Sequence, residues 1–551
     1  MTSQTQEAKR TVRHFRQIVL WPLQLMPLRE SEQIQQHWDV LGLDCPWREV
    51  KDEFGDPAQF QVRHYSEFVT FLPHVQRFLY GEGAARGRAG TDSPIRVFRR
   101  SDIAQVRLTF PSDEQNPLLC EVAHVDLYFF YDIDIVILAV EIAASDIDLS
   151  LAQETLYRVG RAYPTHWEAD GTGGHCLKRV EWLSADGKVL SVSDYERREK
   201  YLAHVCQYRA AEIASHWDFV MRPFVHHHSD DVGSIRFRLV EYHRMPILGY
   251  LAMEDERQVT RGDFVRIGLV AGAGDPATLP FSERHLRDFE YRFCYDRYWD
   301  ETRDVGSRGS RYICCGHAFI LIGDASDRFF ADRSVGLLEQ FRHQYFLIFL
   351  IAHFHKAALL MLSDRLVEAL NRLDIEDVES VRRFKRSIRG MKEIFLRFTH
   401  RYWFHELSDQ PQAKAMYRMC REYLGTDGLY NEVREEIQDM SEYLDSDALR
   451  RQANTVVRLT VVTVFGLIGT VTTGFLGMNL ISEADNPVWL KLVYFAVVAV
   501  PVLWLTFYTM VKSKRLSDFL EALSDERLSA RAKLDALLDV WRNRKEERAA
   551  R

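Results

Sequence analysis

A stripe of small and hydroxylated residues runs along one face of an apolar helix predicted near the C-terminus. Its members recur at intervals of three and four residues, at Thr460, Thr463, Leu467, Thr470, Gly474 and Gly477. The positions between them, such as Val461, Val464 and Ile468, are bulky and apolar, which suits contact with lipid or other helices. Threonine hydroxyls can contact a hydrated cation, and Leu467 can form a hydrophobic constriction. The alternative is that the small residues only permit tight helix packing.

The stripe ends in Gly477-Met478-Asn479, and an acidic connection follows. Glu483 and Asp485 stand where they could attract approaching cations, although exposed acids are ordinary in a loop. Gly477 and Asn479 could also simply terminate a helix, since both residue types favour left-handed caps. Both interpretations stay open from the residues alone.

A second stripe lies further upstream and is acidic. Glu432, Glu435, Asp439 and Glu442 share one face of a predicted helix. Their like charges would repel across a symmetric interface unless cations or basic partners neutralised them. The stripe could therefore sense divalent ions, or it could be a solvated helix face.

Two uncharged segments, Leu459 to Ser482 and Leu492 to Val511, could position the first stripe in a membrane. At about 1.5 Å per residue, each covers the roughly 30 Å hydrocarbon thickness of a bilayer. A third apolar run, Tyr345 to Leu362, contains His353, His355 and Lys356, which would be costly in lipid. We predict that this third run is a buried helix.

The charges that flank the two segments predict their orientation. Arg450, Arg451 and Arg458 precede the first segment, and basic residues from Lys512 to Arg515 follow the second, whereas the connection 480–487 has no Lys or Arg. The positive-inside rule places both flanks in the cytoplasm. A hairpin in the cell (inner) membrane with cytoplasmic termini is expected.

The rest of the chain predicts a cytoplasmic α/β domain followed by helices. Of the 551 residues, 46% are hydrophobic and 27% are charged, which is typical of folded protein. The net charge of −8, with acids and bases interspersed, argues against a nucleic-acid partner. Expected strands are Gln17 to Leu25, Val106 to Phe110, Val125 to Ile142, Ser234 to Tyr242, Phe264 to Ala271 and Tyr312 to Ile322.

Helical periodicity continues through Val335 to Leu373, Val378 to Glu406 and Pro411 to Leu424, and a stalk helix from Leu429 could run unbroken into the first span. The expected organisation is a cytoplasmic α/β domain, a helical region with the stalk, a pore helix, an outer loop, a second span and a cytoplasmic tail helix. These occupy residues 1–325, 326–455, 456–479, 480–487, 488–511 and 512–551.

No catalytic constellation is evident, and neither an enzyme nor a covalently bound cofactor is expected. His226-His227-His228 offers metal-ligand side chains. Consecutive histidines point in different directions, so a loop is expected there in place of a metal site.

A pair of C-terminal membrane helices joined by Gly-Met-Asn, after a long cytoplasmic part and a stalk, resembles the CorA family of divalent-cation channels. The resemblance implies a homopentamer in the lipid bilayer that conducts Mg²⁺, and sometimes Co²⁺ or Ni²⁺, with cytoplasmic divalent ions favouring closure. Mg²⁺ holds its water tightly. A ring of Asn479 amides and Gly477 carbonyls would then accept hydrogen bonds from the ion's coordinated waters, and the threonine stripe would line the pore.

Two departures separate this chain from the usual family pattern. Leu476 stands where an aromatic residue commonly precedes the motif, and Ile481 to Pro487 replaces the usual Met-Pro-Glu loop. A Zn²⁺ or other transition-metal transporter of the same superfamily, with proton coupling as one option, is the closest alternative. A membrane-anchored regulatory scaffold that conducts nothing is the alternative from another class.

Overall fold

The computed structural model describes residues 10–26, 41, 45–50, 62–81, 94–130, 132–228, 235–241, 243–275, 278, 281–300, 309–332, 336–374, 377–477, 487–490, 492–497, 500–501 and 503–504. The chain divides into two units, Met1–Ile437 and Gln438–Arg551. The first is a mixed α/β unit, and its largest element is one 14-stranded sheet.

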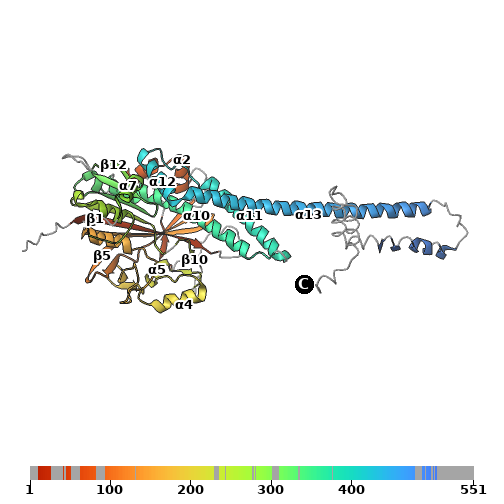
Figure 1. The fold of residues 1–551 in the computed structure, drawn as a ribbon, viewed down its shortest axis with the longest axis horizontal. Coiled ribbons are helices and arrows are strands. Elements are labelled where there is room, and N and C mark those ends of the chain that lie inside the picture. Colours follow the sequence, from red (N-terminus) through yellow and green to blue (C-terminus); the bar gives the residue numbers. More distant parts are fainter. Residues whose placement is uncertain are drawn as a thin grey trace, which may run out of the picture. The chain divides into compact units, whose positions relative to one another are not determined.

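The sheet contains long antiparallel strands at its centre and shorter strands toward its edges (Figure 1). Its main path runs β12-β13-β14-β11-β1-β6-β5-β4-β7-β8, with β2, β3, β9 and β10 joined at the side. The β11–β14 and β9–β10 pairs are parallel. The strands are β1 Thr11–Leu25, β2 Trp47–Glu49, β3 Ile95–Arg100, β4 Gln105–Phe110, β5 Asp113–Phe130, β6 Ile133–Asp148, β7 Arg179–Leu183, β8 Val189–Val192, β9 Phe224–His226, β10 Ile235–Leu239, β11 Ile247–Met253, β12 Cys294–Tyr298, β13 Ser310–Cys314 and β14 Ala318–Asp324.

Helices cover the sheet and then continue toward the C-terminus. They are α1 Val62–Thr70, α2 Pro73–Tyr80, α3 Leu149–Arg158, α4 Arg198–Tyr208, α5 Ser215–Met221, the short 3₁₀ turn η4 Glu256–Gln258, α6 Arg261–Gly268, α7 Glu283–Phe293, α8 Arg328–Ala331, α9 Leu337–Gln340, the π-helical turn η5 Phe341–Tyr345, α10 Phe346–Asn371, α11 Val378–Arg401, α12 Pro411–Leu424 and α13 Thr426–Gly477.

The apolar run that contains α10 is the central helix of the α/β unit. Among the described residues, Leu337–Asn371 is the one helical run long and apolar enough to cross a membrane, and 78% of its most apolar window is buried inside the protein. The helix lies against β1 and β6, and the Phe354 ring stacks on Phe130 at 3.8 Å between centroids. His353 and His355 are both fully buried. The prediction of a buried helix for this run is confirmed.

Three predicted strands need correction. The expected strand Phe264 to Ala271 is helix α6, which begins with a capping box between Thr260 and Asp263. The expected strand Val125 to Ile142 is split into β5 and β6 by a turn in which Asp132 has φ 66°. Likewise, Tyr312 to Ile322 is the β13–β14 hairpin, because Gly316 turns the chain at φ 81°.

A buried ionic cluster ties η5 to the sheet. Glu141 on β6 is 4% exposed, and its Oε1 accepts hydrogen bonds from Arg16 at 2.7 Å and from Arg342 at 2.8 Å. The second Arg342 nitrogen donates to Glu141 Oε2 at 3.0 Å. Burial alone would raise the pKa of Glu141, but the bonds and charge of Arg342, with Arg16, hold it below its usual value.

We expect Glu141→Ala to lower the free energy of unfolding by about 3–5 kcal/mol, because it leaves the two arginines without their buried counter-charge. Thermal or denaturant unfolding of the purified protein measures the loss. The matched control is Glu121→Ala on the neighbouring strand, where the side chain is exposed and the expected change is within about 0.5 kcal/mol. Equal effects of the two substitutions would contradict this role of the cluster.

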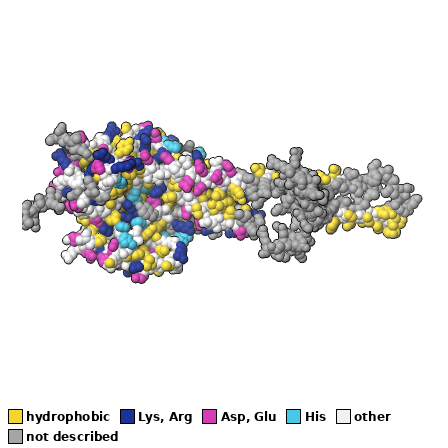
Figure 2. All heavy atoms as spheres, viewed as in Figure 1, with side chains coloured by type: hydrophobic (Ala, Val, Ile, Leu, Met, Phe, Trp, Pro, Cys, Tyr) yellow, Lys and Arg dark blue, Asp and Glu magenta, His cyan; other side chains and the backbone are white. Residues whose placement is uncertain are grey.

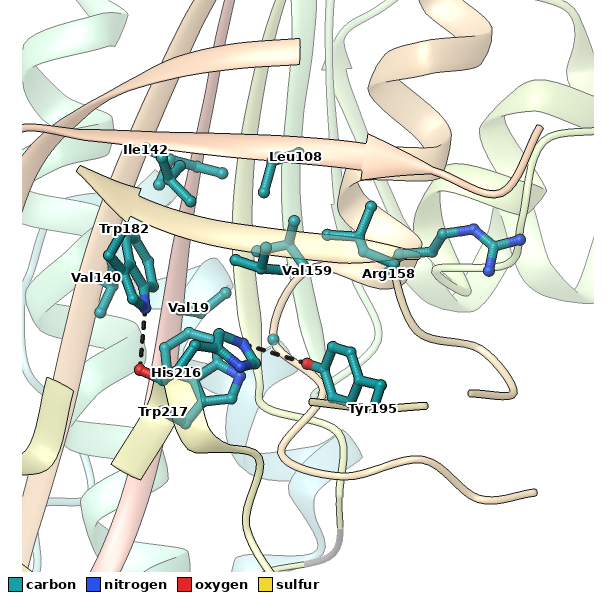
Figure 3. Close-up of a pocket in the computed structure, with 14 residues that line it drawn as sticks. Val19, Leu108, Val140, Ile142, Arg158, Val159, Trp182, Tyr195, His216 and Trp217 are labelled. Carbon is teal, nitrogen blue, oxygen red and sulfur yellow. Dashed lines mark hydrogen bonds between the residues drawn. The ribbon is translucent and has the colours of Figure 1, made fainter. Parts of the chain in front are cut away.

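The interior also contains a small apolar cavity beneath the sheet (Figure 3). It has room for about one water molecule and is lined in part by Val140, Trp182, Tyr195, His216 and Trp217. The Trp182 indole donates to the His216 carbonyl at 3.0 Å, and the Tyr195 hydroxyl lies 3.3 Å from His216 Nε2. A space of this size cannot hold an organic ligand, so we do not assign it a binding function.

Candidate ion pathway

Helix α13 positions both stripes predicted from the sequence. It is one α-helix of 52 residues, or about 78 Å at 1.5 Å per residue. It starts directly after Gly425, whose left-handed conformation (φ 67°) ends α12. The stalk therefore begins at Thr426, three residues earlier than predicted, and continues without a break to Gly477.

The first turns of α13 are clamped onto the α/β unit. The Tyr430 ring stacks on Trp403 at 4.5 Å and lies 5.4 Å from Phe395. Val433 and Ile437 are 0% and 3% exposed. The apolar face of these turns is thus fixed against α11 and the segment that follows it.

The acidic stripe lies on the opposite face. Glu432, Glu435, Asp439 and Glu442 are all exposed, and at 100° per residue their mean direction points away from Val433 and Ile437. Glu436, which is not among the predicted site residues, stands between the two faces. Burial and the nearby Glu432 raise its pKa, and its Oε2 has no hydrogen-bond partner. Among the described residues, no group of three or more His, Cys, Asp or Glu side chains of one chain is arranged to hold a metal ion.

The threonines of the first stripe use their hydroxyl protons on their own helix. Thr460, Thr463 and Thr470 donate to the carbonyls of Val456, Leu459 and Gly466 at 2.9, 2.8 and 2.9 Å. Each hydroxyl oxygen then has lone pairs but no proton to offer outward. Such a surface accepts hydrogen bonds, and the waters around a metal cation are donors.

The remaining stripe positions are open in the single chain. Leu467 is 64% exposed, and nothing lies within 4 Å of where a Cβ would stand on Gly474 or Gly477. Large apolar side chains are exposed around them and on Val488–Val497 (Figure 2). In water this apolar surface would be unfavourable, so lipid or other chains must cover it.

The other predicted site residues lie outside the described part of the chain. These are Met478 and Asn479 of the tripeptide and Glu483 and Asp485 of the outer loop. The second predicted span, Leu492 to Val511, is described only in part.

A comparison with known families bears on this region. The model described as CorA-like Mg2+ transporter protein matches residues 368–515. The C-terminal region is CorA-like. The match begins within α10 and includes α11, α12, α13 and the tripeptide, so it starts about 60 residues before the resemblance visible in the sequence motifs.

The CorA-like region spans about a quarter of the chain, and most of the α/β unit precedes it. A search of curated proteins gave no match. CorA proteins are transporters of divalent cations and not enzymes. The predicted resemblance is confirmed for this region.

Proposed function

We propose that this protein is an oligomeric membrane channel through which hydrated Mg²⁺ enters the cytoplasm, with α13 lining the path. The observation that carries the proposal is that one unbroken helix within the CorA-like match bears both stripes and leads into Gly477-Met478-Asn479.

The two stripes belong to one seven-residue repeat on α13. Its positions follow one another at alternating steps of three and four residues: Glu432, Glu435, Asp439, Glu442, Ser446, Leu449, Ala453, Val456, Thr460, Thr463, Leu467, Thr470, Gly474 and Gly477. A strict repeat of this length stays on one side only if helices wrap around one another in a left-handed supercoil. The repeat therefore favours several copies of α13 around a common axis, and the family resemblance suggests five.

The order of residues along the repeat suits the passage of a hydrated cation. The acidic end would concentrate cations by charge, Leu449, Ala453 and Val456 would form an apolar constriction, and the threonine segment offers hydrogen-bond acceptors. Gly477 and Asn479 would recognise the hydrated ion at the far end. Mg²⁺ prefers to keep several of its waters, so acceptors for water protons suit it better than direct ligands.

The membrane potential supplies the driving force. Two charges that cross 100 mV gain about 4.6 kcal/mol. No chemical coupling is then required. Repulsion among the acidic stripes of several copies would be relieved by cytoplasmic divalent ions, which would favour one arrangement of the helices and give a means of regulation.

The experiment is flux into liposomes that contain the purified protein and a magnesium-sensitive dye. We expect Mg²⁺ entry that follows the membrane potential. Zn²⁺ entry that depends on a proton gradient, without Mg²⁺ entry, would instead indicate a transition-metal transporter of the same superfamily. Absence of flux for every ion, with assembly intact, would favour the non-conducting scaffold.

Thr470→Val tests the threonine segment directly. It removes one acceptor per chain with little change in volume, and a neutral hydrogen bond is worth about 1 kcal/mol, so Mg²⁺ flux should fall by about fivefold. Thr473 is the matched control, because its hydroxyl donates to the Gly469 carbonyl at 3.0 Å in the same way but lies outside the repeat. Thr473→Val should leave the Mg²⁺ flux within about twofold of that of the parent protein. Equal losses of flux in both variants would contradict the proposal that the threonine stripe lines the ion path.

A further inference from the structure

Two cysteines from distant parts of the sequence meet in the core of the α/β unit. Cys314 ends β13 and Cys420 lies on α12, and their sulfur atoms are 3.5 Å apart. Both residues are buried, at 0% and 1% exposure. All eight cysteines of the chain are described and free, and among them this is the one pair whose sulfurs are in hydrogen-bond contact. The other thiols therefore serve as comparisons within the same molecule.

The backbones that carry the two sulfurs are held close together. The β13–β14 turn rests on the last turn of α12, where a Cβ on Gly316 would stand 2.8 Å from the carbonyl carbon of Tyr423. The start of the same helix is tied to β13, because the Gln412 amide donates to the Tyr312 hydroxyl at 2.7 Å. Contacts at both ends of α12 thus keep the two sulfurs opposite each other.

The remaining gap between the sulfurs is small enough for a covalent bond to close it. A disulfide has a sulfur–sulfur distance of about 2.05 Å, so the Cys314 and Cys420 sulfurs need to approach by about 1.5 Å. Rotation about the χ1 angles of the two side chains can supply this movement without displacing a strand or a helix. Cys315 does not compete for Cys420, because its sulfur donates to the Gly268 carbonyl at 3.1 Å instead.

We infer that Cys314 and Cys420 form a reversible redox site, at which a hydroperoxide oxidises the two thiols to a disulfide. A sulfenic acid with a second thiol in reach condenses to a disulfide, whereas a lone one is open to further oxidation. The contact between the two sulfurs supplies that second thiol. In the cytoplasm, where this unit is predicted to lie, glutathione and thioredoxin would reduce the bond again. The disulfide would therefore form only while the oxidant is present.

The atoms and electrons of this step balance with hydrogen peroxide alone. One sulfur, as its thiolate, attacks a peroxide oxygen, so that the O–O bond breaks and a sulfenic acid and a first water are formed. The second sulfur then attacks the sulfenic sulfur and forms the S–S bond. The hydroxide that leaves takes up the proton released from the second thiol and becomes a second water. Two thiols thus lose two electrons, and one hydrogen peroxide is reduced to two molecules of water.

The site lies near the surface although both sulfurs are buried. The residues that follow them in the chain, Cys315 and Arg421, are partly exposed. A molecule as small as hydrogen peroxide therefore needs only a local opening of the β13–β14 turn or of the end of α12. Once formed, the bond would fix α12 covalently to the sheet, six residues before α13 begins at Thr426.

The test is peptide mapping of the full-length protein in detergent after exposure to hydrogen peroxide. Remaining thiols are alkylated, and trypsin then releases Cys420 on residues 419–421 and Cys314 on residues 312–328. At a dose of peroxide that oxidises the exposed Cys206, we expect most chains to give these two peptides joined, with a mass two hydrogens below their sum. Dithiothreitol should separate the two peptides again.

Cys315→Ser is the matched control, because Cys315 lies on the same tryptic peptide as Cys314. This variant should keep the joined peptides, whereas Cys314→Ser and Cys420→Ser should lose them. Fragmentation of the joined peptides between positions 314 and 315 assigns the bond in the parent protein itself, so the result does not depend on how the variants fold. Oxidation of Cys206 without joined peptides would overturn the inference, as would a bond to Cys315 in place of Cys314. Mg²⁺ flux does not enter this measurement, so the inference can fail while the proposed channel stands.

Discussion

Substitution of Asn479 by alanine should reduce potential-driven Mg²⁺ entry by at least about tenfold, since a hydrogen bond to a charged partner is worth about 1.5–3 kcal/mol and every subunit loses one. The amide oxygen is the proposed acceptor for the waters of the entering ion. Alanine keeps the backbone but offers no side-chain acceptor. The measurement is the initial rate of dye response in liposomes that contain equal amounts of assembled protein.

Two further variants make this result specific to Asn479. Asn486→Ala removes an asparagine from the connection between the spans and should leave the rate within about twofold of the parent. Asn479→Gln restores the amide one methylene further out and should recover part of the flux. An Asn479→Ala protein that assembles normally and conducts at the parental rate would refute the role of the tripeptide.

Acidification should unfold the α/β unit well before its carboxylates are protonated. His216, His353 and His355 are fully buried, and burial lowers the pKa of each to about 3. In the folded protein, each of these imidazoles is therefore neutral. His353 Nε2 lies 3.1 Å from the Gly316 carbonyl, and His355 Nε2 lies 2.5 Å from the Tyr402 carbonyl.

The direction of the pH dependence follows from the lowered pKa values of these three histidines. Below pH 6.5 the unfolded chain takes up protons that the folded chain refuses, so the stability is complete above pH 6.5 and is lost as the pH falls toward about 3. At pH 5, each of these histidines lowers the free energy of unfolding by about 2 kcal/mol. Together the three lower it by about 6 kcal/mol, which is comparable with the whole stability of a domain.

Denaturant unfolding at pH 7.5, 6 and 5, followed by near-ultraviolet circular dichroism, measures this loss. His216→Gln should remove about 2 kcal/mol of the loss between pH 7.5 and 5, whereas His285→Gln, at an exposed position, should not change it. A midpoint that stays constant from pH 7.5 to 5 would contradict the assignment of neutral buried imidazoles.

The sequence was sufficient for elements whose hydrophobic pattern is long and regular. Helix α12 has the predicted bounds, and β1 includes the predicted strand. The errors arose where one or two residues decide the local geometry. The capping box Thr260–Asp263 was visible in the sequence, but the apolar residues after it resembled a strand more than a helix. Single turn residues, Asp132 and Gly316, interrupt two segments that were each predicted to be one continuous strand.

The same distinction between regular patterns and local geometry applies to the candidate sites. A periodic stripe on one helix can be found from spacing alone, and the threonine and acidic stripes were predicted in this way. A contact such as that between the rings of His204 and His226, which are 22 residues apart in the sequence and 5.7 Å apart in the structure, cannot be found in this way. No local pattern marks such a meeting of side chains.

The length of α13 has a consequence for how its two stripes could act. The 38 residues from Glu432 to Thr470 correspond to about 57 Å of α-helix. This is several times the screening length of about 8 Å at physiological ionic strength. In the proposed channel, the charge of the acidic stripe would therefore act on an ion near that stripe and not on an ion among the threonines.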